Sequence, residues 1–228
     1  CIPTIFRTTS KTMVDRIASQ LDECDVLGQH REFRLINGRY QGLPVTVCST
    51  GIGGASAVIA LEELVQAGAR SLIRVGSAGA LQHEVALGDL IVVEGAVRSE
   101  GASQAYLPPE YPACADIRLQ AALLAHLGAS GQPHWHGLVR SHDSFYRDDE
   151  QEICRYWHQR GVLGADMETA SLLAVGRLRK VRVAAVLCNV VAFEQDVQAG
   201  VSDYAASEAA MMTGERLAIA AALHALTQ

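Results

Sequence analysis

Blocks of apolar residues with two different spacings follow one another in the first third of the chain. Residues 45–50 form a short β-branched run that suits a buried strand, and three glycines within residues 51–54 indicate a sharp turn after it. Over residues 55–68 the apolar positions recur at helical spacing, and residues 71–75 predict a second strand that runs into Gly-Ser-Ala-Gly at 76–79. The pattern therefore predicts a β-α-β unit with loops at the carboxyl ends of its strands, where open α/β sheets bind ligands.

Similar blocks predict strands and helices in the rest of the chain. Further strands are expected at residues 4–6, 32–36, 40–45, 90–97 and 181–191, and helices near residues 12–21, 117–127, 148–160 and 202–226. Asn37-Gly38, a strong turn signal, predicts a hairpin, and another helix is expected to open at Asp166. Together these elements predict an α/β fold in one domain over residues 1–228, with a central mixed, twisted and partly closed sheet and helices on both faces.

The bulk properties exclude several classes of protein. A net charge of −6 argues against non-specific binding of nucleic acid, which needs a basic face. No apolar run approaches the roughly 20 residues of a membrane span, and no signal peptide is recognised, although the abrupt start at Cys1 leaves preceding residues an open question. The six cysteines are scattered without a C-x-x-C pair, which suits free thiols in a reducing cytoplasm.

Arg74 is a permanent cation in an otherwise apolar predicted strand, directly before the glycine loop at 76–79. Arginine offers paired planar donors, and glycine loops allow backbone N–H groups to approach an oxyanion, so this position predicts an anion site. The alternative is a buried arginine paired with a carboxylate. A dinucleotide site is disfavoured because GIGGAS at 51–56 lacks the G-x-G-x-x-G spacing.

Several motifs in the same order resemble the nucleoside phosphorylase family, particularly its uridine phosphorylase branch. They are HREF at 30–33, STGIGGAS at 49–56, IRVGSAGA at 73–80, EGAS at 100–103, SHDSFY at 141–146, ADMETASLL at 165–173 and LCNVV at 187–191. The similarity covers nearly all of the chain from about residue 14 onward. It implies the fold of that family and phosphorolysis of a ribonucleoside to free base and ribose 1-phosphate.

The resemblance also implies roles for individual residues. Arg74 and Glu168 would be catalytic; phosphate would be bound by Arg31, Arg74, Ser77 and Thr9; ribose by Met167, Glu168 and Ser77; and the base by Phe145, Gly79, Asp149, Gln151 and Asn189. The chemistry of Glu168 fits its role, because one carboxylate can accept hydrogen bonds from both hydroxyls of a ribose. The alternative for Glu168 is an ordinary first-turn glutamate.

The implied partners are small molecules and further copies of the chain. Phosphate would be a co-substrate and no cofactor or metal is implied, although Glu32, Ile52 and Ser56 match positions where some relatives hold a monovalent cation, with K⁺ as the candidate. Arg31 would reach the phosphate site of a neighbouring subunit. The expected assembly is therefore a dimer or a hexamer built as a trimer of dimers.

The chain departs from the family pattern at both ends of the expected substrate. Residues 9–13 replace the Gly-Asp-Pro motif and the arginine of the first phosphate loop, which keeps open a nucleosidase that uses water or a non-catalytic nucleoside-binding protein. Asp149, Gln151 and Val190 replace a glutamine and two arginines that grip uracil. We therefore expect weak activity on uridine, with a purine as the alternative substrate: Asp149 would protonate N7 or Asn189 would donate to it. The other interpretation places Asp149 and Gln151 on a solvated helix face.

Overall fold

The computed structural model describes residues 2–7, 11–194 and 204–228, so Thr9 of the expected phosphate site lies outside the described residues. The strands are β1 (Ile2–Arg7), β2 (Cys24–His30), β3 (Phe33–Tyr40), β4 (Leu43–Ser49), β5 (Ala69–Ala80), β6 (Leu90–Ser99), β7 (Ala113–Cys114), β8 (His134–His142), β9 (Gly164–Asp166) and β10 (Arg182–Val191). The helices are α1 (Lys11–Ala18), α2 (Gly54–Gln66), α3 (Gly101–Gln104), α4 (Ile117–Ser130), α5 (Glu150–His158), α6 (Thr169–Leu178) and α8 (Tyr204–Leu226).

All of these strands belong to one mixed sheet, which is closed over part of its width. The strand order is β10-β6-β8-β9-β5-β1-β4-β3-β2, with β7 paired to β6. An additional pairing between β10 and β5 joins β5, β10, β6, β8 and β9 into a ring. The predicted mixed, partly closed sheet is therefore confirmed, and the β-α-β unit at its centre is formed by β4, α2 and β5.

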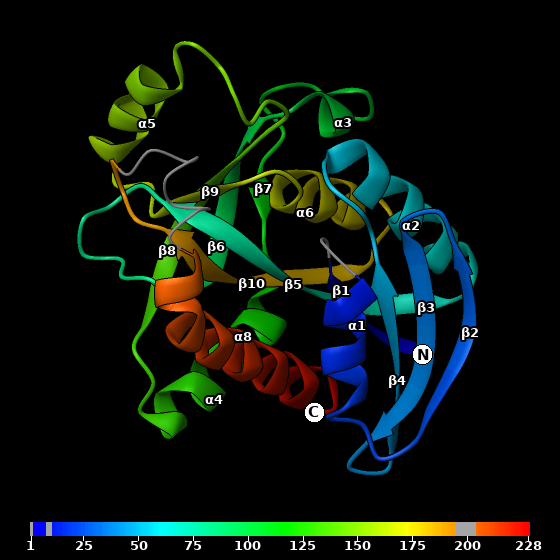
Figure 1. Cartoon of the computed structure of the whole chain (residues 1–228). Coiled ribbons are helices and arrows are strands. Elements are labelled where there is room, and N and C mark those ends of the chain that lie inside the picture. The colour runs from blue at the N-terminus through cyan, green and yellow to red at the C-terminus, as the bar shows by residue number, and fades with distance from the viewer. Residues whose placement is uncertain (1, 8–10, 195–203) are drawn as a thin grey trace.

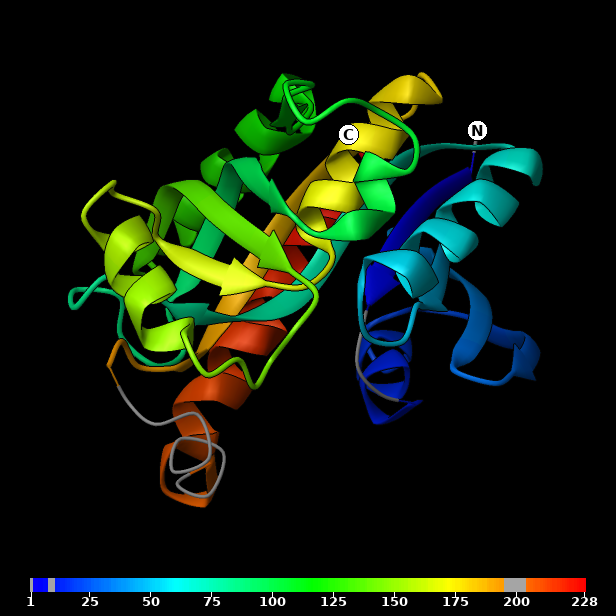
Figure 2. The same ribbon diagram turned by 90° about the horizontal axis from the view of Figure 1, so that it is seen from above.

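Helices cover both faces of the sheet, as predicted. Helices α1, α4 and α8 lie on one side in Figure 1, and α8 packs on α4, β10 and β5. Helices α2, α3 and α6 lie on the other side and contact one another. Seen from above, α2 and strands β1 to β4 form one flank of the molecule, and the ring of strands forms the other (Figure 2).

The centre of the core is β5, which is paired to β1, β10 and β9. Its residues Leu72, Ile73 and Val75 are no more than 1% exposed. Burying each such side chain contributes roughly 1.5–3 kcal/mol, so β5 provides a firmly held platform for the residues at its carboxyl end.

The predicted hairpin turn at Asn37-Gly38 is wrong. These two residues lie inside β3, and the chain turns instead at residues 31–32 and 41–42. Positive φ angles occur at Arg31 (55°) and Gln41 (50°), and Gly42 (77°) completes the second turn. The whole β2–β3–β4 meander is therefore shifted from the register that the turn signal implied.

Packing explains why the dipeptide is extended. The Asn37 side chain accepts a hydrogen bond from Thr46 Oγ1 on the neighbouring strand at 2.7 Å. A Cβ atom at Gly38 would lie 2.4 Å from the carbonyl oxygen of Glu23. Gly38 therefore serves a close backbone approach, a common reason for glycine within a strand.

Candidate active site

A large cavity opens at the carboxyl ends of β5 and β10, close to the ends of β8 and β9. Its volume is about 1010 Å³. The wall is formed by Ile52, Ser77 to Leu81, His142, Phe145 to Asp148, Glu150, Gln151, Cys154, Arg155, Ala165 to Glu168 and Val190 to Glu194. Ligands of α/β sheets bind at such strand ends, so this cavity is the candidate active site.

Arg74 lies beneath this cavity in a network of buried carboxylates. It is 1% exposed, and its Nη2 donates to Glu168 Oε2 at 2.7 Å. The same nitrogen lies 3.0 Å from Asp166 Oδ2, and Nε donates to Asp166 Oδ2 and to Thr169 Oγ1, both at 3.1 Å. These contacts show the alternative interpretation, a buried arginine paired with carboxylates, whereas the anion site at Arg74 stays a prediction.

Gly76 provides the space for this guanidinium. Residues 74 and 76 point to the same face of β5 because side chains alternate along a strand. A Cβ atom at Gly76 would lie 2.6 Å from Arg74 Cζ. The loop expected at residues 76–79 is wrong, because β5 continues to Ala80, and within the strand Gly76 lets the Arg74 side chain run toward the carboxyl end of β5.

Glu168 sits at the start of α6. The predicted start at Asp166 is wrong, because residues 164–166 form β9, and the helix begins at Thr169 with Glu168 as its N-cap. The Glu168 side chain does not cap α6 but accepts from the backbone N–H of Gly53 at 2.6 Å. Burial raises the pKa of the Glu168 carboxyl, while Arg74 acts in the opposite direction.

Other expected phosphate, ribose and base residues meet in the cavity wall. Ser77 and Gly79 line it from β5, and Met167 lines it beside Glu168. Phe145 contributes an aromatic face, is 43% exposed, and packs edge-to-face on Tyr146 with ring centroids 5.2 Å apart. Ser77 and Glu168, which lie 91 positions apart in the sequence, thus line one cavity.

Of the two predicted base ligands near α5, only one lies in the cavity wall. Gln151 lines the cavity, whereas Asp149 does not belong to its wall. Asp149 is exposed, and its carboxylate accepts from Arg147 Nε at 2.8 Å and Nη2 at 2.7 Å. This hydrogen-bonded pair lowers the pKa of Asp149, so the predicted role as a proton donor to N7 is corrected.

Asn189 is also turned away from the cavity. It is fully buried, and its amide nitrogen donates to the carbonyl oxygens of Val85 at 3.2 Å and Ala86 at 3.1 Å. The neighbouring Val190 and Val191 line the cavity instead. The predicted base contact by Asn189 is therefore corrected to an anchor for the loop before β6.

The residues expected at a subunit contact lie near the tip of the β2–β3 hairpin. Arg31 is exposed in the turn and does not line the cavity of its own chain. Ser56 Oγ donates to Glu32 Oε1 at 3.0 Å and also to the Thr50 carbonyl oxygen. Ile52 lines the cavity and is 66% exposed, so this cluster lies next to the cavity mouth.

Several polar residues of the site were not predicted, among them an aspartate, a histidine and two arginines. Asp166 completes the Arg74 network, and His142, Arg147 and Arg155 line the cavity. For Asp166 and His142 a signal existed, because each is a titratable residue at the carboxyl end of a strand. Arg147 places a cation, paired with Asp149, in the same wall as Gln151.

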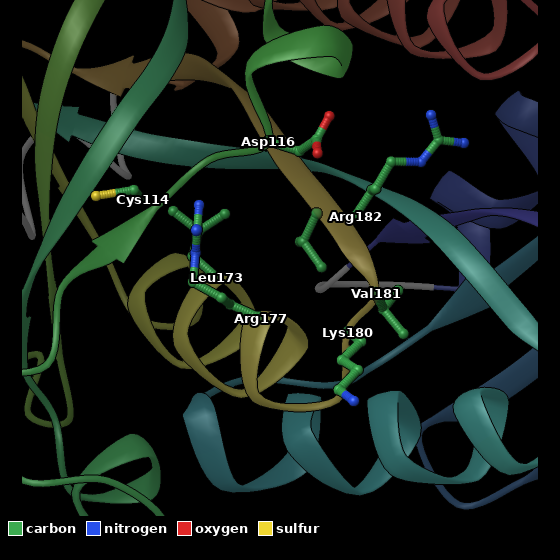
Figure 3. Close-up of a pocket in the computed structure, with 8 residues that line it drawn as sticks. Cys114, Asp116, Leu173, Arg177, Lys180, Val181 and Arg182 are labelled. Atoms are coloured by element: carbon green, nitrogen blue, oxygen red, sulfur yellow. The ribbon is translucent and has the colours of Figure 1, made fainter.

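A smaller cavity of about 200 Å³ lies at the far end of α6 and is lined by Cys114, Asp116, Leu173, Arg177, Lys180, Val181, Arg182 and Val183 (Figure 3). Its polar groups have structural partners: Asp116 Oδ1 caps α4 by accepting from Arg118 N and Leu119 N, and Arg182 donates to Ser71 Oγ. Cations after a helix carboxyl end also stabilise its dipole. This cavity therefore needs no ligand to explain its charges.

The described residues offer neither a metal cluster nor a membrane-spanning helix. They contain no cluster of three or more histidine, cysteine, aspartate or glutamate side chains arranged to hold a metal ion. None of the helices within the described ranges combines the length and apolar character needed for a membrane span.

Comparisons with known proteins agree on one family. The family described as "Phosphorylase superfamily" matches residues 8–225. Uridine phosphorylase of Escherichia coli (strain K12) is 38% identical over 192 residues, which cover 77% of this chain and 76% of that protein. Guanosine phosphorylase of Halorubrum lacusprofundi is 36% identical over 177 residues, 78% of this chain and 73% of that protein. The crystal structure of uridine phosphorylase from Vibrio fischeri ES114 has a TM-score of 0.92 at 46% identity, covering 98% of this chain and 91% of that one.

Proposed function

This chain belongs to the phosphorylase superfamily and is a nucleoside phosphorylase, a pentosyltransferase, and we propose that the large cavity beside Arg74 and Glu168 is its active site. The reaction breaks the N-glycosidic bond of a ribonucleoside and joins C1′ to phosphate. Positive charge develops on the ribose ring and negative charge on the departing base. The site must therefore bind an anion, hold the ribose diol and support the base.

The buried network supports assignment of the phosphate and ribose ends. Arg74 would bind phosphate together with Ser77 on the same strand, and Arg31 of a neighbouring subunit would add a second cation. Glu168 and Met167 would hold the ribose. The observation that carries this proposal is the 2.7 Å contact between Arg74 and Glu168, because it joins an anion-binding group to a diol-binding group beneath one cavity.

The connection between β8 and α5 supports assignment of the base end. Phe145 would stack on the base, Gln151 would bind its edge, and backbone groups near Gly79 would complete the contact. Arg147 lines the same wall and could offset negative charge on a departing base. Because Asp149 already pairs with Arg147 at 2.7 Å, much of this charge is offset, and weak activity on uridine stays the prediction.

Assembly and location belong to the same proposal. Arg31 would complete a partner's phosphate site across a two-fold contact, which makes a dimer the minimal active unit and permits a hexamer built from three dimers. Glu32, Ser56 and Ile52 would supply the monovalent cation site at that contact, with K⁺ as the candidate. The free cysteines Cys24, Cys48, Cys114, Cys154 and Cys188 support a reducing cytoplasm as the place where the enzyme works in nucleoside salvage.

A direct assay tests the proposed reaction. Release of free base from uridine, thymidine, inosine and adenosine is measured with and without phosphate, and ribose 1-phosphate is quantified in the same samples. We expect base release to depend on phosphate and to match ribose 1-phosphate mole for mole. Base release that continues unchanged without phosphate would establish a nucleosidase instead.

A further inference from the structure

His142 is a cavity residue to which the proposed reaction gives no role. It stands at the end of β8, three positions before Phe145, and is only 7% exposed while lining the cavity. Its Nδ1 lies 2.8 Å from the carbonyl oxygen of Ser144. A carbonyl oxygen can only accept, so Nδ1 carries the proton in this hydrogen bond.

The surroundings favour a neutral ring. Charged groups face His142 from three elements: Arg140 on its own strand, Glu150 on α5 and Asp166 on β9. Burial is the largest influence and lowers the pKa of His142, with Arg140 acting in the same direction and the two carboxylates opposing it. With the proton fixed on Nδ1, the neutral ring leaves Nε2 as an acceptor.

This acceptor has no hydrogen-bond partner within the described part of the chain. His142 belongs to the cavity wall, in the segment that also supplies Phe145. We propose that His142 Nε2 accepts a hydrogen bond from the ring N–H of the nucleobase and so selects bases whose edge is a lactam. The inference rests on the proposed nucleoside phosphorylase function and names the substrate class of that site.

Nucleobases fall into two groups according to whether the ring nitrogen at this edge carries a hydrogen. Uracil has N3–H, and hypoxanthine and guanine have N1–H, beside a carbonyl oxygen. Cytosine N3 and adenine N1 carry a lone pair at the corresponding place, which would face the lone pair of Nε2. A site with a fixed acceptor rejects a ligand that lacks the matching donor because its own polar group is then left unpaired.

Donors in the same wall suit the carbonyl groups that flank such an N–H. The amide of Gln151 and the guanidinium groups of Arg147 and Arg155 all line the cavity. A lactam base offers an acceptor next to its donor, which matches one imidazole acceptor among several donors. The inference therefore joins uracil and 6-oxopurines in one substrate class and separates both from cytosine and adenine.

Methylated substrates provide the test. We would compare kcat/KM for uridine and 3-methyluridine, and for inosine and 1-methylinosine, on the parent enzyme, His142→Ala and His142→Gln. The parent should prefer each unmethylated nucleoside, and His142→Ala should reduce that preference about tenfold, as expected for one lost hydrogen bond. His142→Gln retains an amide oxygen and should restore part of it. His136→Ala, an exposed change on the same strand, is the matched control.

The outcomes separate this inference from the proposed function. If His142→Ala lowers activity on methylated and unmethylated substrates by the same factor, or if the parent cleaves cytidine and adenosine as well as uridine and inosine, the inference is overturned while the phosphorylase stands. Calorimetry with uracil and 3-methyluracil on the same variants needs no turnover. Tighter binding of uracil that depends on His142 supports the inference even if no nucleoside is cleaved, and equal binding overturns it.

Discussion

The guanidinium of Arg74 donates to the carboxylate of Glu168 over 2.7 Å, and both side chains are buried. The groups proposed for phosphate and for ribose therefore form one electrostatic unit. Changes to either residue should alter the other, so their effects on catalysis should not add.

A double-mutant cycle measures this coupling. Arg74→Ala should lower kcat/KM by roughly 10²–10³, the usual effect of removing one preorganised donor, and Glu168→Ala should have an effect of similar size. The double variant should lose less than the product of the two factors. Arg74→Ala should also lose about 3–5 kcal/mol of stability, because two buried carboxylates are left without their cation. Glu168→Ala should lose less, because Arg74 keeps Asp166 as its partner.

The exposed pair of Arg179 and Glu62 serves as the control. Their side chains meet at 2.7 Å, with Arg179 39% exposed. Arg179→Ala should change stability by no more than about 1 kcal/mol and leave kcat/KM unaltered. Independent, fully additive losses for Arg74 and Glu168 would contradict the idea of a single unit.

Gly76→Ala should displace the Arg74 side chain. The added Cβ would lie 2.6 Å from Arg74 Cζ, so the guanidinium has to move. We expect a stability loss of about 1–3 kcal/mol and a raised KM for phosphate, measured by thermal unfolding and by phosphate titration. In Gly128→Ala, by contrast, the new Cβ meets nothing within 4 Å, and this helical change should stabilise the protein by up to about 1 kcal/mol. Normal phosphate affinity in Gly76→Ala would show that the position of Arg74 is not critical.

Gln151→Arg should raise kcat/KM for uridine relative to inosine. The new guanidinium would enter the cavity wall and stabilise negative charge on departing uracil, whereas a purine can leave neutral after protonation. Gln159→Arg makes the same chemical change at an exposed position at the end of α5 and should leave both values unchanged. A uridine-to-inosine ratio that is the same in all three proteins would exclude Gln151 from the base contact.

The pH dependence of activity should report Glu168. The ionised carboxylate is needed to accept from the ribose hydroxyls, and burial raises its pKa. The value of kcat/KM should therefore fall as pH drops through this raised pKa, above the ordinary range for glutamate. Glu168→Gln cannot ionise, so its remaining activity should show no such acid limb. An acid limb that persists in Glu168→Gln would assign the titration to another group.

The raised pKa of Glu168 also makes the free energy of unfolding depend on pH, in the direction opposite to that of kcat/KM. Because the folded-state pKa of Glu168 is raised, its contribution is fully present below the unfolded value of 4.5 and is lost as pH rises through the folded pKa. Thermal unfolding of the parent and of Glu168→Gln across this range measures the difference. A stability gap between the two proteins that is constant with pH would contradict the assigned shift.

Mixing two inactive variants tests whether Arg31 acts across subunits. Arg31→Ala and Glu168→Gln should each have little activity alone. In a mixed dimer, one site would receive an intact Glu168 and an intact Arg31 from the partner. After complete exchange of equal amounts, about a quarter of parent activity should return, because half the dimers are mixed and each has one intact site. No recovery, despite exchange shown by mass spectrometry, would place both residues in the same subunit's site.

Local patterns predicted the centre of this fold well. The glycine-rich turn and the helical spacing after it indicate the end of β4 and helix α2 correctly, whereas β5 continues through the predicted loop to Ala80. Asn37-Gly38 misled because both residues satisfy long-range contacts, with Thr46 and with the backbone at Glu23, that a local turn rule cannot include. Tertiary packing overrode the turn propensity there.

Side-chain direction limited the prediction of the site. Six of the expected residues line the cavity, and their roles stay predictions: Ser77, Gly79, Phe145, Gln151, Met167 and Glu168. Asn189 does not line the cavity, because the carbonyl groups of Val85 and Ala86 take up its amide. Asp149 does not line the cavity either, because its near neighbour Arg147 binds its carboxylate at the exposed surface. Each correction depends on a partner that the linear sequence does not identify.

The two ends of the cavity differ in how far they can change over evolution. Arg74 has a paired neighbour on each side of β5, Phe6 of β1 and Ala185 of β10, so moving it would disturb the centre of the sheet. Residues 143–149 belong to no strand or helix and can accept substitutions at little structural cost. Descendants of this enzyme could therefore exchange one nucleobase for another by altering that connection, while the bond-breaking chemistry of their ancestor is inherited unchanged.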